Sequence, residues 1–253
     1  MNQTQNPPHT QPLANKVILV TGASEGIGRA TAKAFAQAGA TVILSGRNQS
    51  RLESCYDDII AATNTTPSIL PFDLSSTETQ DYQMITDAID AQYGQLHGLI
   101  HNAGILGKRC DIASLPFDDW QRVLQINLNA PLLLTKAMLP LLRIPETASV
   151  LFTSSSVGRQ GRAFWGGYAV SKFAIEGLMQ VLADELENTS HIRINSFNPG
   201  ATATAMRHAA FPGEDQTTLP QPESLAPYYI YLMSDASQAI RGQALNAKEI
   251  TPV

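Results

Sequence analysis

Three residues in the second half of the chain have types and a spacing suited to acid–base chemistry. Lys172 follows Tyr168 by four positions, and Ser155 precedes the tyrosine by thirteen. On a helix, residues four apart share a face, so the lysine ammonium would lie beside the phenol and favour its ionised form. A tyrosine that releases its proton near neutral pH is a general acid/base. The spacing alone is weak evidence, because a surface tyrosine beside a solvated lysine has it as well.

A glycine-rich segment follows the first apolar run of the chain. It comprises Thr21-Gly-Ala-Ser-Glu-Gly-Ile-Gly28 and precedes an alanine-rich helical pattern. Gly22 permits a tight turn, while Gly26 and Gly28 let the backbone approach a pyrophosphate at the helix N-terminus, where free N–H groups favour anions. The position of the motif predicts a dinucleotide site. Glycines that serve only a tight strand-to-helix connection are the alternative.

The segment after the second apolar run indicates which dinucleotide would bind. It contains Ser45, Gly46, Arg47 and Asn48, and it has no carboxylate where an NAD-preferring site binds the ribose hydroxyls. Arg47 could form charge-assisted contacts with a 2′-phosphate, assisted by Arg29 or Ser45. The alternative is that both arginines are ordinary surface charges. We therefore predict NADP(H) as the cofactor.

Seven short apolar runs alternate with longer segments of helical periodicity, which indicates repeated βαβ units. The chain is predicted to form a single-domain α/β fold of the Rossmann type, a doubly wound parallel sheet of about seven strands with helices on both faces. The predicted strands are Val17–Val20, Thr41–Leu44, Ser68–Phe72, Leu96–His101, Ser149–Thr153, Ile192–Phe197 and Gln243–Asn246. We assign 1–14 to a disordered N-terminal tail, 15–253 to the NADP(H)-binding domain and 204–222 to a substrate lid.

Composition excludes several classes of function. The 253 residues carry a net charge of −5 and no basic run, which argues against a nucleic-acid partner. Apolar residues make up 43% of the chain, enough for a substantial core, but no stretch is long enough to span a bilayer. Cys55 and Cys110 follow no metal-ligand spacing and form no disulfide framework, so no metal is predicted. We expect a soluble, cytoplasmic protein with no membrane association.

Six signatures, in this order, resemble the short-chain dehydrogenase/reductase family over about 15–246. They are Thr21–Gly28, Asp73-Leu74, His101-Asn-Ala-Gly104, Asn127, Ser155 with Tyr168–Lys172, and Asn198-Pro-Gly200 followed by Thr204. Within the family, the residues around the site are most similar to the bacterial YciK-type subgroup. His101 departs from the Asn that is common there, and we expect altered strand packing from it. The C-terminal segment lacks the usual Asp-Gly-Gly ending, which puts subunit contacts inferred from that region in doubt.

The resemblance implies a role for each matching residue. Tyr168 would be the catalytic acid/base, and Lys172 would lower its pKa and bind the nicotinamide ribose. Ser155 would hydrogen-bond the substrate oxygen, and Asn127 would position a water of the proton relay through its helix backbone. The implied cofactor-binding set is Gly22, Ser24, Gly26, Ile27, Gly28, Arg47, Asp73, Leu74, Asn102, Ala103, Gly104, Tyr168, Lys172, Pro199, Gly200, Thr202 and Thr204.

The choice of serine and the shape of the substrate pocket are separate expectations. The interval to Tyr168, together with Gly158, selects the middle serine of 154–156, because neighbouring side chains on an extended strand point to other faces. Phe164 and Trp165 could form an apolar pocket wall. Arg159 or Arg162 could attract an acidic substrate group, although arginines mostly remain solvated.

The predicted function is hydride transfer between NADP(H) and a small carbonyl or alcohol substrate. The alternative is a catalytically silent NADP(H)-binding sensor or scaffold, which could dispense with the acid/base group found here. A hydrolase is disfavoured because the serine cluster lacks a Gly-x-Ser-x-Gly elbow. The resemblance also implies a homodimer or homotetramer. An apolar stripe at helical spacing could serve either the core or such an interface; it comprises Ile175, Leu178, Met179, Leu182 and Leu186.

Overall fold

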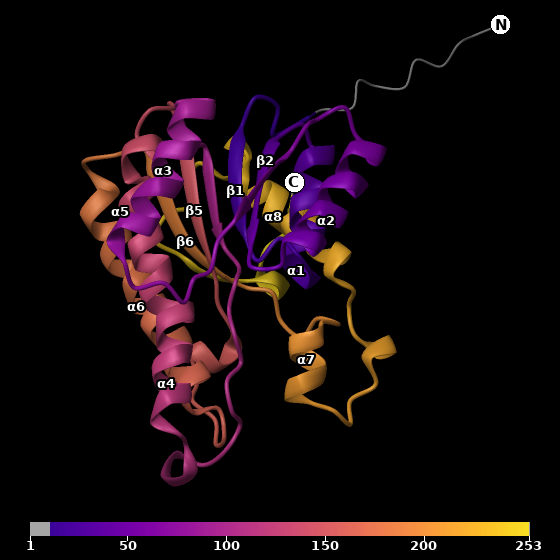
Figure 1. The fold of residues 1–253 in the computed structure, drawn as a ribbon, viewed down its shortest axis with the longest axis vertical. Helices are drawn as coiled ribbons and strands as arrows, with labels where there is room; N and C mark the ends of the chain where they lie inside the picture. Colours follow the sequence, from indigo (N-terminus) through magenta and orange to yellow (C-terminus); the bar gives the residue numbers. More distant parts are fainter. Residues whose placement is uncertain (1–10, 253) are drawn as a thin grey trace, which may run out of the picture.

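A seven-stranded parallel sheet forms the centre of the molecule (Figure 1), in a computed structural model that describes residues 11–252. The strand order is β3-β2-β1-β4-β5-β6-β7, so the order reverses between β1 and β4. This topology confirms the predicted α/β fold. The strands are β1 (Val17–Thr21), β2 (Thr41–Gly46), β3 (Ser68–Pro71), β4 (Gly98–His101), β5 (Ala148–Thr153), β6 (Ile192–Asn198) and β7 (Ala244–Asn246).

Helices cover both faces of the sheet (Figure 1). One face carries α1 (Gly26–Gln37), α2 (Gln49–Ala62) and α8 (Ala226–Met233). The other carries α3 (Thr79–Tyr93), α5 (Ala130–Leu142) and α6 (Gly166–Glu187). At the carboxyl ends of the strands lie α4 (Phe117–Leu124), a π-helical turn at Gln125–Asn129 and α7 (Ala205–Ala210).

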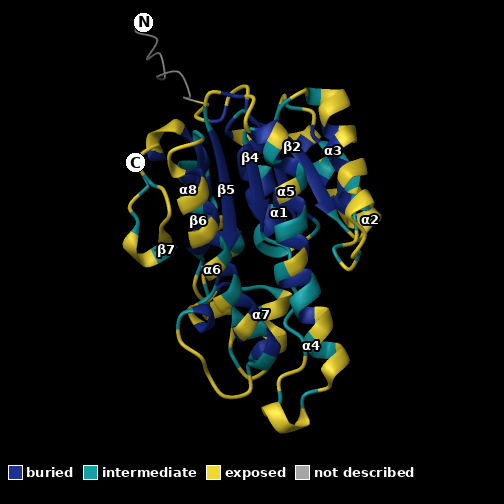
Figure 2. Ribbon diagram, turned by 90° about the vertical axis from the view of Figure 1, so that its left-hand side faces the viewer, coloured by how far each residue is buried: buried dark blue, intermediate teal, exposed yellow. Residues whose placement is uncertain are grey.

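The side chains of β1 point alternately to the two faces of the sheet, and each face packs against its own hydrophobic core. Ile18 and Val20 pack against the α1, α2 and α8 side, whereas Val17 and Leu19 pack against the α3, α5 and α6 side. Successive strand residues point to opposite faces, and a strand covered on both faces is a continuous apolar run. Figure 2 shows the buried strands between helices whose outer surfaces are exposed. The rigid sheet therefore holds the loops at its carboxyl edge in place.

Helix α6 presents two different apolar stripes. Most of the predicted stripe is buried in the core, including Ile175, Met179 and Leu182. A second stripe lies on the outer face, where Val170, Phe173 and Val181 are 42%, 46% and 56% exposed. The predicted stripe thus belongs to the core, and a face that the prediction did not include is left open.

The predicted N-terminal tail has the wrong boundary. Residues 1–10 lie outside the described part of the chain, but residues 11–14 belong to the domain. Leu13 is fully buried, and its N–H donates to the carbonyl oxygen of Ala38 at 3.0 Å. One buried leucine within a polar stretch carries no periodic signal, so the sequence pattern missed this contact.

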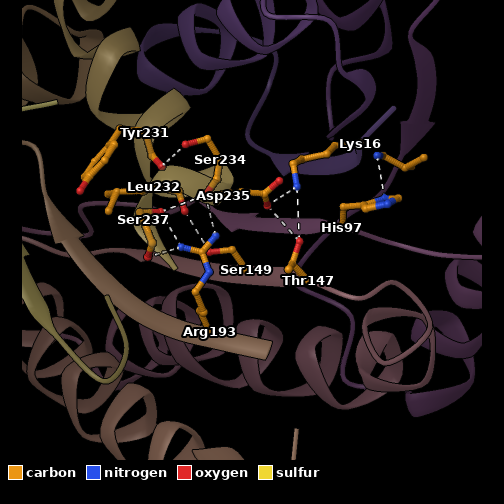
Figure 3. A network of polar contacts seen from close by, with 11 residues as sticks. Lys16, His97, Thr147, Ser149, Arg193, Tyr231, Leu232, Ser234, Asp235 and Ser237 are labelled. Atoms are coloured by element: carbon orange, nitrogen blue, oxygen red, sulfur yellow. Dashed lines mark hydrogen bonds and ion pairs between the residues drawn. The ribbon is translucent and has the colours of Figure 1, made fainter. Parts of the chain in front are cut away.

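A polar network ties the end of α8 to the amino-terminal ends of the strands (Figure 3). Arg193, near the start of β6, is 3% exposed and donates to the carbonyl oxygens of Ser237 at 2.7 Å and Ser234 at 3.1 Å. Lys16, just before β1, pairs with Asp235 at 2.8 Å. These contacts stabilise the edge of the sheet opposite the loops described below. In the described part of the chain, every helix is too short or too polar for a membrane span.

Candidate active site

A cavity of about 740 Å³ opens at the carboxyl ends of β1 to β6, next to the point where the strand order reverses. Parallel α/β sheets bind ligands at this location. All predicted site residues line the cavity except Gly28 and Asn127, which lie behind its wall. Those on the wall are Gly22, Ser24, Gly26, Ile27, Arg47, Asp73, Leu74, Asn102, Ala103, Gly104, Ser155, Tyr168, Lys172, Pro199, Gly200, Thr202 and Thr204.

The glycine-rich loop is packed so closely that side chains could not be accommodated. A Cβ at Gly28 would lie 2.1 Å from the carbonyl oxygen of Gly22, and Gly22 itself has a φ of +69°. No side chain caps the N-terminus of α1. Its first N–H groups, with the helix dipole, are therefore free to bind an anion. This cradle fits the pyrophosphate of a dinucleotide.

Thr21 fixes the glycine-rich loop to the segment after β4. Its hydroxyl donates to the carbonyl oxygen of Ile100 at 3.0 Å and accepts from the N–H groups of Asn102 and Ala103 at 3.0 and 3.1 Å. The Asn102 side chain donates to the carbonyl oxygen of Thr21 at 3.2 Å. Both walls of the cavity at this end are thereby held in one geometry.

Two arginines lie at the end of the cavity beyond β2. Arg47 is exposed and lines the cavity, as predicted, while Arg51, which the sequence analysis missed, also lines it and pairs with Glu25. Arg29 binds Asp58 at 2.9 Å and lies outside the cavity wall, so the structure does not support its suggested help with the 2′-phosphate. The sequence signal that could have identified Arg51 is its position, four residues after Arg47 and at the start of a helix.

Asn127 lies in the π-helical turn between α4 and α5, and it is 2% exposed. Its side chain accepts from the N–H of Ile105 and donates to the carbonyl oxygen of Ile105, both at 2.9 Å. It also donates to the hydroxyl of Ser171 at 3.1 Å. Asn127 therefore joins the loop after β4 to α6. Single π turns of this kind are frequent at functional sites.

Tyr168, Lys172 and Ser155 meet on the cavity wall. Lys172 Nζ lies 5.6 Å from the centroid of the Tyr168 ring and donates to the carbonyl oxygen of Thr153 at 2.6 Å. The predicted neighbourhood of ammonium and phenol is thus present. Ser154 and Ser155 both line the cavity and Ser156 does not, but Ser155 is the serine that hydrogen-bonds the phenol.

Burial dominates the proton affinities of this pair. It raises the pKa of Tyr168 to about 12, against a hydrogen bond with Ser155 that lowers it. It lowers the pKa of Lys172 to about 8, against the negative charge of Glu176 that raises it. In the protein without bound cofactor, the phenol pKa is therefore raised and not lowered: loss of solvent around the phenol outweighs the hydrogen bond with Ser155.

The segment 204–222 lines one side of the cavity through Thr204 and α7. Arg109, from the loop after β4, donates to the carbonyl oxygen of Ala210 and lies 4.5 Å above the ring of Trp165 and 5.2 Å above that of Phe211. The Trp165 ring in turn lies 5.8 Å from the ring of Tyr168. Arg109 thus connects this segment to Trp165 at the start of α6, a contact that sequence spacing did not indicate.

The structure supports only one of the four side chains considered for the substrate pocket. Phe164 is 57% exposed, has a φ of +70° and lies outside the cavity wall; only Trp165 of the pair lines it. Arg159 points into a network with Glu176 and Asn246 instead of toward the cavity. Arg162 is exposed and also lies off the wall. Each position depends on tertiary partners that the local sequence does not specify.

His101 takes part in strand packing, as expected. It is 5% exposed, stacks on Phe152 at 4.7 Å and hydrogen-bonds the hydroxyl of Thr135 at 2.8 Å. Burial lowers its pKa to about 3. Within residues 11–252, no cluster of three His, Cys, Asp or Glu side chains could hold a metal ion.

A glycine-rich loop at the switch point and a Ser-Tyr-Lys group on the same cavity define a class of nucleotide-dependent oxidoreductases. A family model described as short chain dehydrogenase matches residues 16–215, and the chain belongs to the short-chain dehydrogenase/reductase family. The oxidoreductase YciK of Escherichia coli (strain K12) is 46% identical over 244 residues, covering 95% of this chain and 96% of the relative. The predicted relation to the YciK-type subgroup is confirmed.

Two solved structures resemble the whole chain. A short chain dehydrogenase from Escherichia coli CFT073, in complex with NADPH, has a TM-score of 0.92 at 46% identity and covers 95% of this chain and 100% of that chain. One from Shigella flexneri 2a, in complex with NADP, also has a TM-score of 0.92 at 46% identity, covering 94% and 99%. Similarity at this level shows that the two proteins share the fold of this chain.

Proposed function

We propose that the protein reduces a carbonyl group, or oxidises the corresponding alcohol, with NADP(H) as cofactor and Tyr168 as general acid/base. The observation that carries the proposal is that Tyr168, Ser155 and Lys172 share one cavity with the glycine-rich loop. Two similar proteins were crystallised with NADP or NADPH, which supports the choice of cofactor. The complete acid–base group disfavours a silent binding protein.

The cavity has separate ends for the two halves of the cofactor. Arg47 and Arg51 lie at the end beyond β2, where they would contact a 2′-phosphate, and Asp73 and Leu74 would adjoin the adenine. The pyrophosphate would bind at the N-terminus of α1. The nicotinamide would then lie between the Pro199–Thr204 segment and the catalytic tyrosine, where the bound cofactor would supply or accept the hydride.

In the reduction direction, the chain's own groups manage the proton. Ser155 and Tyr168 hydrogen-bond the carbonyl oxygen, on which negative charge develops, and Tyr168 donates its proton to that oxygen. The phenolate left behind is stabilised by the nearby charge of Lys172. Burial raises the pKa of Tyr168 to about 12, so the charge of Lys172 and the bound cofactor would have to lower it again. Each pKa unit of this lowering requires about 1.4 kcal/mol of stabilisation of the phenolate.

The substrate end of the cavity favours an apolar carbonyl compound. Apolar side chains line it, among them Leu106, Trp165 and Met206. Arg207 of α7 also lines this end, but Glu214 engages it with two contacts of 2.5 and 2.6 Å. A substrate carboxylate would have to displace Glu214. We therefore propose that residues 204–222 act as a lid over a substrate with uncharged substituents.

We also propose a cytoplasmic homodimer or homotetramer. The exposed stripe on α6, formed by Val170, Phe173 and Val181, supports self-association because isolated subunits rarely expose contiguous apolar surface. Cys55 and Cys110 are both free thiols, which suits a reducing compartment. Sedimentation over a range of protein concentrations tests the assembly: a single monomeric species at micromolar concentration would contradict it.

A substrate screen tests the proposed function. NADPH oxidation is followed with a panel of ketones, aldehydes and quinones, each apolar ketone being matched by a carboxylated analogue. We expect turnover with apolar members of the panel, weaker turnover with their carboxylated partners and inertness toward activated esters. NADPH binding without oxidation by any carbonyl compound would favour the silent binding protein instead.

A further inference from the structure

A buried carboxylate lies one helical turn beyond the catalytic lysine. Glu176 is four positions after Lys172 on α6, and its side chain is 8% exposed. One oxygen accepts from the hydroxyl of Ser196 on β6 at 2.5 Å, and the other accepts from Arg159 Nε and Nη2 at 3.3 and 3.4 Å. Buried carboxylates are rare unless they are paired, so the burial of Glu176 points to a specific role for its charge.

Arg159 connects Glu176 to the last strand of the sheet. Its Nη1 donates to Asn246 Oδ1 at 2.6 Å, and its Nη2 donates to the carbonyl oxygen of Leu245 at 3.1 Å. Asn198 Nδ2 donates to the same Asn246 oxygen at 3.0 Å, and the side chain of Asn198 accepts from Gly200 N–H at 3.1 Å. The network thus extends from α6 through β7 to the segment beside the nicotinamide end of the cavity.

Glu176 is the charged group whose field raises the pKa of Lys172 against the effect of burial. On its own helix, Lys172 also faces the phenol of Tyr168, at 5.6 Å from the ring centroid. From β5 it meets the neutral carbonyl of Thr153, and from the loop after β4 it meets Gly104. Arg159 reaches it only through the carboxylate of Glu176. The charge of Glu176 is therefore the main protein field that favours the ammonium form.

We propose that Glu176 is a positioning residue that keeps the catalytic ammonium of Lys172 charged, and that Arg159, anchored by β7, limits how much of that negative charge reaches the lysine. The proposal rests on the proposed function, because it assigns Lys172 its charged role at Tyr168. Burial lowers the pKa of Lys172 to about 8, so a modest change in the field alters its ionisation between pH 7 and 9. No contact of Glu176 or Arg159 with the substrate is required.

Two substitutions act on Lys172 in opposite directions. Glu176→Gln keeps the shape but removes the negative charge, so the pKa of Lys172 falls. Arg159→Gln keeps a donor for Glu176 but removes the competing positive charge, so the pKa of Lys172 rises. A purely structural network would instead give losses of the same sign in both variants. Nearby charges change such pKa values by about one unit or more.

The experiment measures kcat/KM for carbonyl reduction from pH 6 to 10. The alkaline limb, where Lys172 loses its proton, should move to lower pH by about one unit in Glu176→Gln and to higher pH in Arg159→Gln. At pH 6, Glu176→Gln should retain activity within about threefold of wild type, since Lys172 is then protonated in both. Glu176→Asp should restore part of the limb, and Arg162→Gln, an exposed arginine nearby, should leave it unchanged.

A second readout separates this inference from the proposed function. The chemical shift of the Lys172 side-chain ε-carbon, assigned with Lys172→Met, is titrated by NMR in the NADPH complex of each protein. Opposite pKa changes in the two variants support the inference even if no substrate is found. Unchanged titration of Lys172, or a pH-independent loss of activity in both variants, would overturn it and leave the role of Tyr168 intact.

Discussion

The ammonium of Lys172 lies beside the ring of Tyr168, 5.6 Å from its centroid, but gives its hydrogen bond to the carbonyl oxygen of Thr153. The lysine is thereby fixed by β5, and in the proposed mechanism it would act on the phenol through its charge rather than by direct proton transfer. This arrangement requires that helix α6 and strand β5 keep their mutual position.

Gly28→Ala should abolish tight NADPH binding, because its Cβ would lie 2.1 Å from the carbonyl oxygen of Gly22. The backbone of the loop must move, and the pyrophosphate cradle moves with it. Fluorescence titration with NADPH should give a dissociation constant at least about tenfold higher. Gly161→Ala is the matched control, since its Cβ would meet open space. Wild-type affinity in Gly28→Ala would contradict the assigned loop.

Arg47→Ala and Arg51→Ala should each weaken NADPH binding by about tenfold or more while leaving NADH binding nearly unchanged. A hydrogen bond to a charged phosphate contributes about 1.5–3 kcal/mol, and NADH lacks the phosphate. Arg29→Ala is the control, because Arg29 binds Asp58 outside the cavity. Titrations of each variant with both cofactors give the comparison. Equal losses for NADH and NADPH would show that the arginines act on the fold and not on the 2′-phosphate.

Arg109→Ala should loosen the lid. The substitution removes a hydrogen bond to the Ala210 carbonyl and the stacking of a cation on Trp165 and Phe211. Each contact of this kind contributes about 1 kcal/mol, so KM for the carbonyl substrate should rise about tenfold. Lys108→Ala, beside it in the sequence, is the control. The account of the lid fails if KM stays at the wild-type value while NADPH affinity falls.

The two histidine substitutions His101→Leu and His208→Gln should differ in their effect on acid stability. Burial lowers the pKa of His101 to about 3, so below about pH 6.5 the unfolded state binds a proton that the folded state does not. The free energy of unfolding is therefore unaffected by protonation of this histidine above pH 6.5. Below that value it falls by up to about 1.4 kcal/mol per pH unit as the pH approaches 3.

Urea unfolding at several pH values measures this dependence. His101→Leu should flatten the decline of the unfolding free energy between pH 6.5 and 4, even though the substitution lowers stability at neutral pH by losing the Thr135 contact. His208 is exposed, and its substitution should leave the slope as in wild type. An unchanged slope in His101→Leu would mean that other groups carry the acid sensitivity.

The strands and the main site residues were predictable because their signals are local. A continuous apolar run such as Val17–Val20 specifies a buried parallel strand, and the glycines after it specify the loop. The positions of the arginine side chains, by contrast, were not predictable from local signals. Arg29 and Arg159 both looked available to a ligand, yet Asp58 and Glu176 engage them across distances of 29 and 17 positions. Ion-pair partners depend on the assembled fold, which residue spacing does not specify.

The same distinction applies to chemistry at the tyrosine. The spacing of Tyr168 and Lys172 predicted their common face on α6, but the direction of the phenol pKa depends on how deeply the folded protein buries the ring. Likewise, Leu13 in the predicted tail is buried against the end of α1. Desolvation is a property of the surroundings, and the sequence pattern carries little information about it.

The central claim is that Tyr168 transfers the proton, and Tyr168→Phe tests it most directly. The variant removes one hydroxyl from the cavity wall, so its NADPH dissociation constant should stay within about threefold of wild type. Tyr228→Phe, which lies off the wall, controls for loss of a tyrosine hydroxyl elsewhere. With a substrate from the carbonyl panel, kcat of Tyr168→Phe should fall by about a hundredfold or more. A variant that binds NADPH and retains wild-type kcat would contradict the account.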